Sequence, residues 1–298
     1  MNHGALRGIW TALATPFDRG FQIDWKAFDR LLEQQAQGKV TGVVISGTTG
    51  ESPTLTVQEK LAMVRKARAN LPASVRVMAG SGGNNTEQSV ELSRLCVEAG
   101  ADSLLIVTPP YNKPSIAGLK LHFEAIAQAV KVPLCLYHVP GRTAQKLTAE
   151  QISSICVLPS IGAIKEASAD LGLFSDVREK YAHVLMTGDD VTFLPSLSVG
   201  GDGVISVLTN IFPAEFVRMM AAFEAGRVKE AQRIHHALAP FINALFCESN
   251  PGPLKAALKL RGLAENVVRL PLAPVTPTNF QAIQTALSQT DKDLAALS

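Results

Sequence analysis

Eight short apolar segments recur along the chain, and their spacing limits the possible folds more than any other feature of the sequence. The segments begin at an average spacing of roughly 25 to 30 residues, and longer amphipathic stretches separate them. The eight apolar segments span residues 8–13, 42–45, 75–79, 103–107, 133–137, 161–165, 183–186 and 203–206. This alternation is typical of successive βα units.

The apolar segments are continuously apolar rather than alternating, as expected of parallel strands that are buried on both faces. Between them, a helical period predicts helices over residues 25–37, 56–69, 86–99, 116–129, 148–156, 171–180 and 192–199. Thr56 and Glu59 form a capping-box pattern, and Gly100 marks a helix end. Eight such units that close on one another predict a (β/α)8 TIM barrel.

The part of the chain after the eighth segment predicts further helices over residues 214–225 and 228–238. We expect one of them to complete the barrel and the rest to form a C-terminal helical extension. The predicted division is therefore a barrel with the catalytic site at 1–225 and an extension packed on it at 226–298. The alternative is an open doubly wound sheet, but no G-x-G-x-x-G follows the first segment and eight segments exceed its usual five or six.

Composition narrows the class of protein. Of the 298 residues, 47% are hydrophobic and 18% charged, which excludes a disordered chain. The 28 basic and 26 acidic residues nearly cancel, so we expect no nucleic-acid partner. No uncharged apolar stretch approaches the ~18 residues that span a bilayer, so we expect no membrane association. Four cysteines without a C-x-x-C pair predict buried free thiols and a cytoplasmic protein: Cys96, Cys135, Cys156 and Cys247.

Lys165 is the strongest candidate for a catalytic residue. A TIM barrel places its active site at the carboxyl ends of its strands, and Lys165 ends the sixth apolar segment. Desolvation at such a position lowers the pKa of an amine, as a nucleophilic lysine requires. The sequence therefore suggests a lysine that forms a Schiff base. The alternative is an ordinary strand-end lysine that extends to solvent or pairs with Glu166.

Tyr137 ends the neighbouring segment, close enough in a barrel to reach a substrate held on Lys165. A phenol transfers protons when it is hydrogen-bonded to another hydroxyl, and Thr48 and Tyr111 offer such groups. Arg142 follows a Pro-Gly turn, where its guanidinium is able to bind a carboxylate in bidentate fashion. The alternatives are amphipathic tyrosines at the barrel rim and a solvated loop arginine.

Metal and cofactor sites are not expected. The six histidines show no metal-binding spacing, and the Asp189-Asp190 pair has no second carboxylate cluster to share a cation. Several glycines at the strand ends either let the backbone approach a small anion or simply form turns: Gly47, Gly50, Gly188 and Gly203. We predict neither a metal nor an organic cofactor.

Three motifs resemble one known family. Residues 8–17 (GIWTALATPF), 47–51 (GTTGE) and 139–143 (VPGRT) are similar to those of the dihydrodipicolinate synthase / N-acetylneuraminate lyase family of class I aldolases. The resemblance extends from about residue 8 to about residue 277. The paired threonines at 48–49 and the arginine of 139–143 resemble the synthase members rather than the lyases, in which a serine usually precedes a single threonine.

The resemblance implies a role for each candidate residue. Lys165 would form the Schiff base, and Tyr137 would act as general acid and base. Thr48 and Tyr111 would complete the proton relay, with Tyr111 reaching across a tight dimer interface into the partner's site. The substrate-binding residues would be Thr49, Arg142, Ile205 and Gly188, with Thr49 and the Ile205 backbone at pyruvate.

The implied reaction condenses pyruvate, held as an imine, with L-aspartate-4-semialdehyde, a step of diaminopimelate and lysine biosynthesis. The implied assembly is a homotetramer, a dimer of tight dimers. Two rivals are a lyase of the same family acting on a sugar acid or 4-hydroxy-2-oxo acid, and a non-catalytic sensor of 2-oxo acids. The sensor predicts loss of Lys165, Tyr137 or a relay hydroxyl, and the chain has them all.

The chain departs from the family pattern at His138, usually asparagine, and at Pro110, often aromatic. The resemblance also places a feedback pocket for lysine at six positions: Ser52, Pro53, Lys60, Asn84, Gln88 and Pro110. In the lysine-sensitive pattern, the positions of Lys60, Gln88 and Pro110 hold histidine, glutamate and tyrosine. A missing carboxylate and an added cation predict weak or absent inhibition by lysine.

Overall fold

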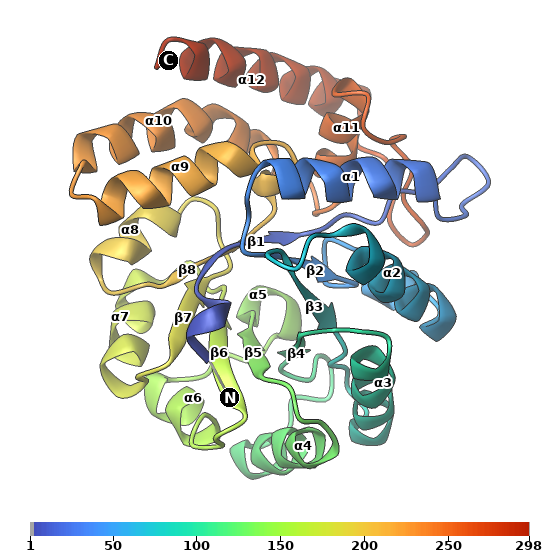
Figure 1. Cartoon of the computed structure of the whole chain (residues 1–298), viewed down its shortest axis with the longest axis vertical. Coiled ribbons are helices and arrows are strands. Elements are labelled where there is room, and N and C mark those ends of the chain that lie inside the picture. The colour runs from blue at the N-terminus through green and yellow to red at the C-terminus, as the bar shows by residue number, and fades with distance from the viewer. Residues whose placement is uncertain (1–2, 298) are drawn as a thin grey trace.

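Eight parallel strands close into a barrel in the computed structural model, which describes residues 3–297 (Figure 1). The strands follow one another around the barrel in sequence order. Their bounds are β1 Gly8–Ala12, β2 Gly42–Ile45, β3 Arg76–Gly80, β4 Ser103–Val107, β5 Leu134–His138, β6 Ile161–Glu166, β7 Val184–Thr187 and β8 Gly203–Ser206. The predicted TIM barrel is confirmed, and each predicted segment agrees with its strand to within one residue at either end.

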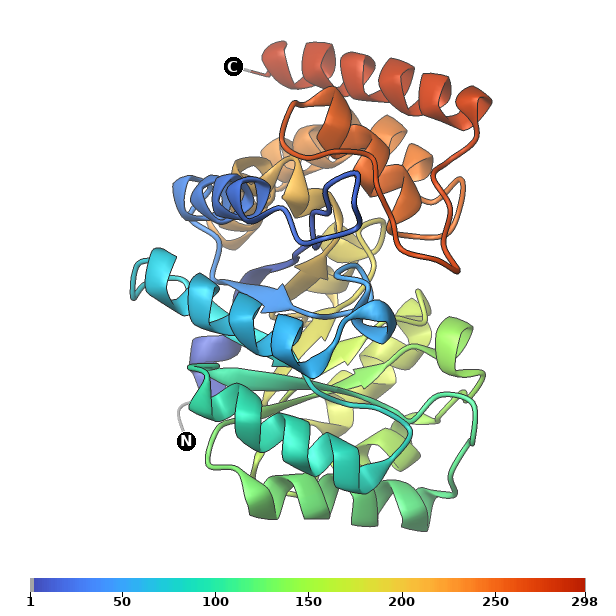
Figure 2. The ribbon, with the colours of Figure 1, turned by 90° about the vertical axis from the view of Figure 1, so that its right-hand side faces the viewer.

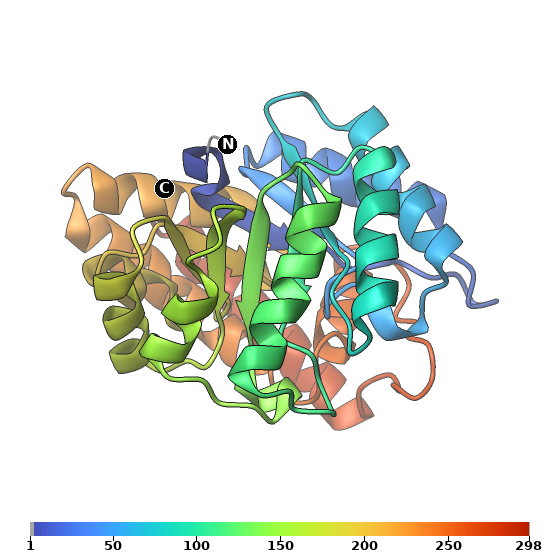
Figure 3. The same ribbon diagram turned by 90° about the horizontal axis from the view of Figure 1, so that it is seen from below.

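Each strand is followed by a helix that covers the outside of the barrel (Figure 1). These helices are α1 Trp25–Gln37, α2 Val57–Asn70, α3 Thr86–Glu98, α4 Ile116–Ala129, α6 Ala149–Ile155, α7 Leu171–Lys180, α8 Phe193–Ser198 and α9 Pro213–Glu224. The capping box at Thr56 is present, and Gly100 follows α3 with a φ of +104°. Figure 3 shows α3 and α4 side by side against the strands.

The interior of the barrel is closed at the amino ends of its strands. Trp10 of β1 is fully buried there, and its indole Nε1 donates a hydrogen bond of 2.7 Å to the Leu6 carbonyl in the short 3₁₀ helix η1 (His3–Leu6). Met78, Met186 and Ile205 fill the next part of the interior. Because packed side chains occupy this end, a substrate site inside the barrel has to open at the carboxyl ends of the strands.

Three further helices follow α9: α10 Val228–Ala244, α11 Gly252–Leu260 and α12 Pro277–Ala295 (Figures 1 and 2). α10 packs against α9, and α12 packs against α10 and α11. The expected boundary at residues 225 and 226 falls in the turn between α9 and α10, and the division itself stays a prediction. None of the helices within residues 3–297 is long and apolar enough to span a bilayer.

Cys247 corrects one expectation from the sequence. Cys96, Cys135 and Cys156 are buried free thiols as expected, whereas Cys247 is exposed. It lies in the loop after α10, beside Phe246, which is also exposed. Its apolar neighbours in the sequence therefore do not place it in the core.

Candidate active site

The pairing of β5 with β6 brings Tyr137 and Lys165 together. The two residues are register partners, so their side chains point to the same face of the sheet, toward the barrel interior. Each is only 6% exposed, and the Lys165 Nζ lies 4.3 Å from the centroid of the Tyr137 ring. The predicted amine and phenol therefore share one desolvated environment.

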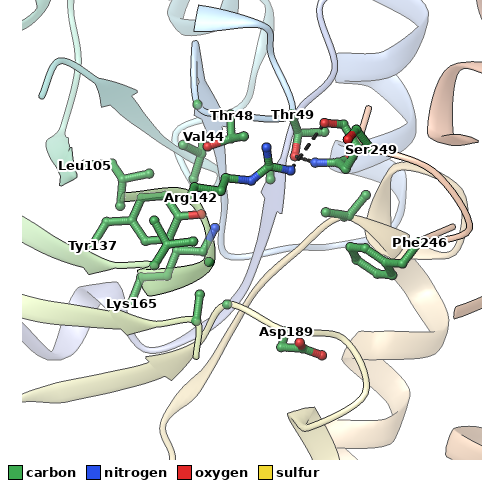
Figure 4. Close-up of a pocket in the computed structure, with 18 residues that line it drawn as sticks. Val44, Thr48, Thr49, Leu105, Tyr137, Arg142, Lys165, Asp189, Phe246 and Ser249 are labelled. Carbon is green, nitrogen blue, oxygen red and sulfur yellow. Dashed lines mark hydrogen bonds between the residues drawn. The ribbon is translucent and has the colours of Figure 1, made fainter. Parts of the chain in front are cut away.

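Both residues line a cavity of about 400 Å³ at the carboxyl ends of the strands. Six of the eight predicted site residues line it: Thr48, Thr49, Tyr137, Arg142, Lys165 and Gly188. The threonines lie in the turn after β2, and Arg142 lies on a short helix after β5 that the sequence did not predict, α5 Pro140–Thr143. Figure 4 shows Tyr137 and Lys165 on one side of the cavity and the Arg142 side chain extending across it.

Gly188 is required by the position of Lys165. A Cβ atom at residue 188 would lie 2.5 Å from the Lys165 Cε and 2.6 Å from the Ala167 Cβ. Any larger residue would therefore displace the lysine chain. The predicted anion-binding role of this glycine stays a prediction, but the structure gives it a steric function.

Two predicted residues do not line the cavity. Tyr111 is 90% exposed, in a loop where its own φ is 73°, so its phenol does not meet Thr48 and Tyr137 within one chain. Ile205 of β8 is fully buried, and its side chain packs in the barrel interior. The expected role of Tyr111 in the site of a partner subunit stays a prediction.

Residues after α10 complete the cavity, and sequence reasoning missed them: Phe246, Ser249 and Asn250. The Asn250 Nδ2 donates a hydrogen bond of 3.0 Å to the Thr49 Oγ1, and the Arg142 Nη2 donates one of 3.4 Å to the Asn250 carbonyl (Figure 4). The signal in the sequence is the run Asn250-Pro251-Gly252-Pro253, which is typical of a break between helices and does not by itself indicate a binding residue.

A second cavity of about 620 Å³ adjoins the first and shares Thr48, Tyr137 and Arg142 with it. All six positions of the expected lysine pocket line this cavity: Ser52, Pro53, Lys60, Asn84, Gln88 and Pro110. Burial lowers the pKa of Lys60. The two cavities are therefore neighbours that are separated only by side chains common to both.

Metal ligands are not clustered in the part of the chain that the structure describes: residues 3–297 contain no group of three or more His, Cys, Asp or Glu side chains placed to hold an ion.

Comparison with known proteins identifies the family. The model of the Dihydrodipicolinate synthetase family matches residues 5–290. The chain belongs to this family. It is 42% identical over 287 residues to a 4-hydroxy-tetrahydrodipicolinate synthase of Methanococcoides burtonii, covering 95% of this chain and 97% of that protein.

Solved structures of the family have the same fold. The 4-hydroxy-tetrahydrodipicolinate synthase of Methylacidiphilum fumariolicum SolV superposes with a TM-score of 0.95 at 37% identity, covering 98% of each chain. A dihydrodipicolinate synthase of Acinetobacter baumannii in complex with pyruvate superposes with a TM-score of 0.92 at 34% identity, covering 96% of this chain and 99% of that one.

A buried ion pair ties the threonine turn of this family member to α11. The Lys255 Nζ lies 2.6 Å from the Glu51 Oε1, and both side chains are fully buried. The Lys255 Nζ also donates a hydrogen bond of 2.7 Å to the Val267 carbonyl and lies 4.1 Å from the centroid of the Phe17 ring. Burial lowers the pKa of Lys255 to about 8, and Glu51 opposes that shift.

Glu51 follows the threonine turn directly and has a left-handed backbone with a φ of 56°. Its Oε2 accepts a hydrogen bond of 2.9 Å from the Arg269 amide, and the Arg269 guanidinium pairs with Glu59 of the capping box. This pairing lowers the pKa of Glu59 to about 2. The turn that carries Thr48 and Thr49 is thus fixed from two segments of the C-terminal part.

Replacing Lys255 with methionine should lower the free energy of unfolding by about 3 to 5 kcal/mol, because Glu51 would remain as a buried, unpaired charge. The double variant Glu51→Gln with Lys255→Met should recover part of the loss. Lys259→Met is the matched control, because Lys259 lies on the same helix as Lys255 but pairs with Glu265 at the surface. The Lys259 and Glu265 side chains are 47% and 41% exposed, and such a pair is worth about 0 to 1 kcal/mol. Denaturant unfolding measures all three. Equal losses for Lys255→Met and Lys259→Met would contradict this account.

Proposed function

We propose that this chain is a 4-hydroxy-tetrahydrodipicolinate synthase, which joins pyruvate to L-aspartate-4-semialdehyde in diaminopimelate and lysine biosynthesis. The observation that carries the proposal is the desolvated Lys165 beside Tyr137, in one cavity with Arg142. Family membership and the names of the relatives support the same activity.

Lys165 supplies the nucleophile. Its neutral amine attacks the ketone carbon of pyruvate, and loss of water leaves an imine on Nζ. The protonated imine nitrogen then accepts electron density, so the methyl group of pyruvate loses a proton and an enamine forms. Thr49 would bind the pyruvate carboxylate, and its hydrogen bond from Asn250 supports this role because it fixes the hydroxyl in the cavity. The low exposure of Lys165 supports this role, since bulk water is excluded from the imine.

Tyr137 transfers protons in the following step. The enamine carbon attacks the aldehyde, and the phenol donates a proton to the alkoxide that develops. Thr48 lines the same cavity, and Tyr111 of a second copy would complete the relay, which fits its exposure in the single chain. The amine of the semialdehyde then displaces Lys165 by transimination and closes a six-membered ring. The ring product leaves and the free amine of Lys165 is restored.

The proposed assembly is a homotetramer built from two tight dimers, in which the exposed Tyr111 would reach into the site of a partner. We propose that residues 226–298 form the extension that packs on the barrel and completes the cavity, and that the reaction uses no metal or organic cofactor. We also propose a cytoplasmic protein, which the four free thiols support. The second candidate function is cleavage of a sugar acid or 4-hydroxy-2-oxo acid by the same lysine and tyrosine. Arg142 and the Thr48-Thr49 pair favour the synthase.

Replacing Arg142 with alanine should raise the KM for aspartate semialdehyde by roughly 30-fold or more, because removal of a charged carboxylate partner typically costs about 2 kcal/mol or more. Arg142→Lys keeps the charge but not the bidentate geometry, so its KM for aspartate semialdehyde should lie between those of the wild type and Arg142→Ala. A coupled condensation assay gives the KM of each substrate, and the KM for pyruvate should stay near its wild-type value. An equal rise for both substrates would argue against the synthase.

Lysine should inhibit this protein weakly or not at all. Gln88 provides no charge for the ammonium group of the ligand, and Lys60 adds a cation to the same cavity. Loss of one charged partner costs on the order of 2 kcal/mol. Gln88→Glu restores the carboxylate and should increase sensitivity, while Lys60→His should reduce repulsion. Condensation assays over a series of lysine concentrations measure this, and inhibition of the wild-type protein at submillimolar lysine would contradict the prediction.

A further inference from the structure

His138 and Glu166 follow Tyr137 and Lys165 directly in β5 and β6, and they are themselves register partners. Because side chains alternate along a strand, this second pair points away from the cavity, toward the layer between the barrel and its helices. The exposed fractions of the two side chains are 0% and 2%. Neither residue lines the cavity of the proposed active site.

The His138 ring connects two segments by hydrogen bonds. The Leu147 amide donates a hydrogen bond of 3.2 Å to the His138 Nε2. This nitrogen is therefore an acceptor, and the ring proton lies on Nδ1. The Nδ1 donates a hydrogen bond of 3.0 Å to the Glu166 Oε1. The same carboxylate oxygen accepts a hydrogen bond of 3.0 Å from the Ser168 amide. Every nitrogen of the buried ring thus has a partner.

Leu147 is the far end of the segment that carries Arg142. The chain leaves β5 at His138, turns through α5, passes Ala144 in a left-handed conformation with a φ of 54°, and returns to the barrel at Leu147. Leu147 is 2% exposed, so its amide has no access to bulk water in place of the imidazole. The His138 ring therefore holds the start and the end of this segment together.

We propose that His138 is a positioning residue for Arg142, and that its bond to the Leu147 amide sets the place at which the guanidinium meets the carboxylate of the aldehyde substrate. The proposal rests on the proposed function of Arg142. His138 touches no substrate, so its effect passes through the segment from residue 139 to 147. The hydrogen bond to Glu166 has a different role, because it joins β5 and β6, the two strands that carry Tyr137 and Lys165.

Two substitutions separate the two bonds of the ring. His138→Asn places an amide near the position of Nδ1, so it keeps a donor for Glu166 but leaves the Leu147 amide unpaired. His138→Gln places its side-chain oxygen near the position of Nε2, so it keeps the acceptor for Leu147 and gives up the donor to Glu166. We expect His138→Asn to raise the KM for aspartate semialdehyde about ten-fold, an effect of about 1.4 kcal/mol. His138→Gln should stay within about two-fold of the wild type.

A double variant tests whether the effect passes through Arg142. On the Arg142→Ala background, His138→Asn should add no further loss in the KM for aspartate semialdehyde, because the group that it positions is already gone. The rate of pyruvate trapping by borohydride should be unchanged in His138→Asn. His122→Asn is the matched control: this histidine of α4 is also buried and bonded, at 2.9 Å to the Thr86 hydroxyl, but lies away from the cavity.

Hydrogen exchange gives a readout that does not depend on the reaction. The amides of residues 139–150 should exchange faster in His138→Asn than in the wild type and in His138→Gln, while His122→Asn should leave this segment unchanged. If the wild-type protein fails to condense the two substrates, the proposed function fails, and the exchange data still decide whether His138 holds the segment.

Three results would overturn the proposal. One is a wild-type KM for aspartate semialdehyde in His138→Asn. Another is an equal further rise on the Arg142→Ala background, and the third is unchanged exchange of residues 139–150. If His138→Asn does not fold, His138→Gln carries the test alone: it has to keep the KM and the exchange rates of the wild type, and a rise in either overturns the proposal.

Discussion

The register between β5 and β6 determines where the chemistry takes place. It sets Tyr137 opposite Lys165 on the inner face of the barrel and His138 opposite Glu166 on the outer face. The inner pair is nearly excluded from solvent, and the outer pair is hydrogen-bonded and buried. A slip by one residue would exchange the two faces and move the amine out of the cavity. Gly188 on the loop after β7 then leaves the volume that the lysine chain needs.

The cavity is built from both parts of the chain. The barrel supplies Lys165, Tyr137 and the threonine turn, and the region after α10 supplies Phe246, Ser249 and Asn250. The buried pair of Glu51 and Lys255 joins the two parts directly after the turn that carries Thr48 and Thr49. Because an unpaired charge at this depth is costly, the turn that carries Thr48 and Thr49 is coupled to the C-terminal helices. The extension therefore belongs to the site as well as to the fold.

Much of the barrel could be predicted from the sequence because strand spacing and continuous apolar runs are local signals. Lys165, Tyr137 and Arg142 could be found because they stand at strand ends or after a turn, where a barrel places its chemistry. Asn250, Phe246 and the partner of Glu51 could not be found in this way. They come within reach of β2 only through long-range packing, and about 200 residues separate Asn250 from Thr49. The exposure of Tyr111 and Cys247 likewise depends on how loops project from the packed helices.

Reductive trapping decides whether Lys165 forms an imine with pyruvate. The protein is incubated with pyruvate and borohydride, digested, and examined by mass spectrometry, with Lys165→Ala in parallel. We expect one reduced pyruvyl adduct on the peptide that contains Lys165 and none in the variant. An adduct on another lysine, or an undiminished adduct in Lys165→Ala, would contradict it.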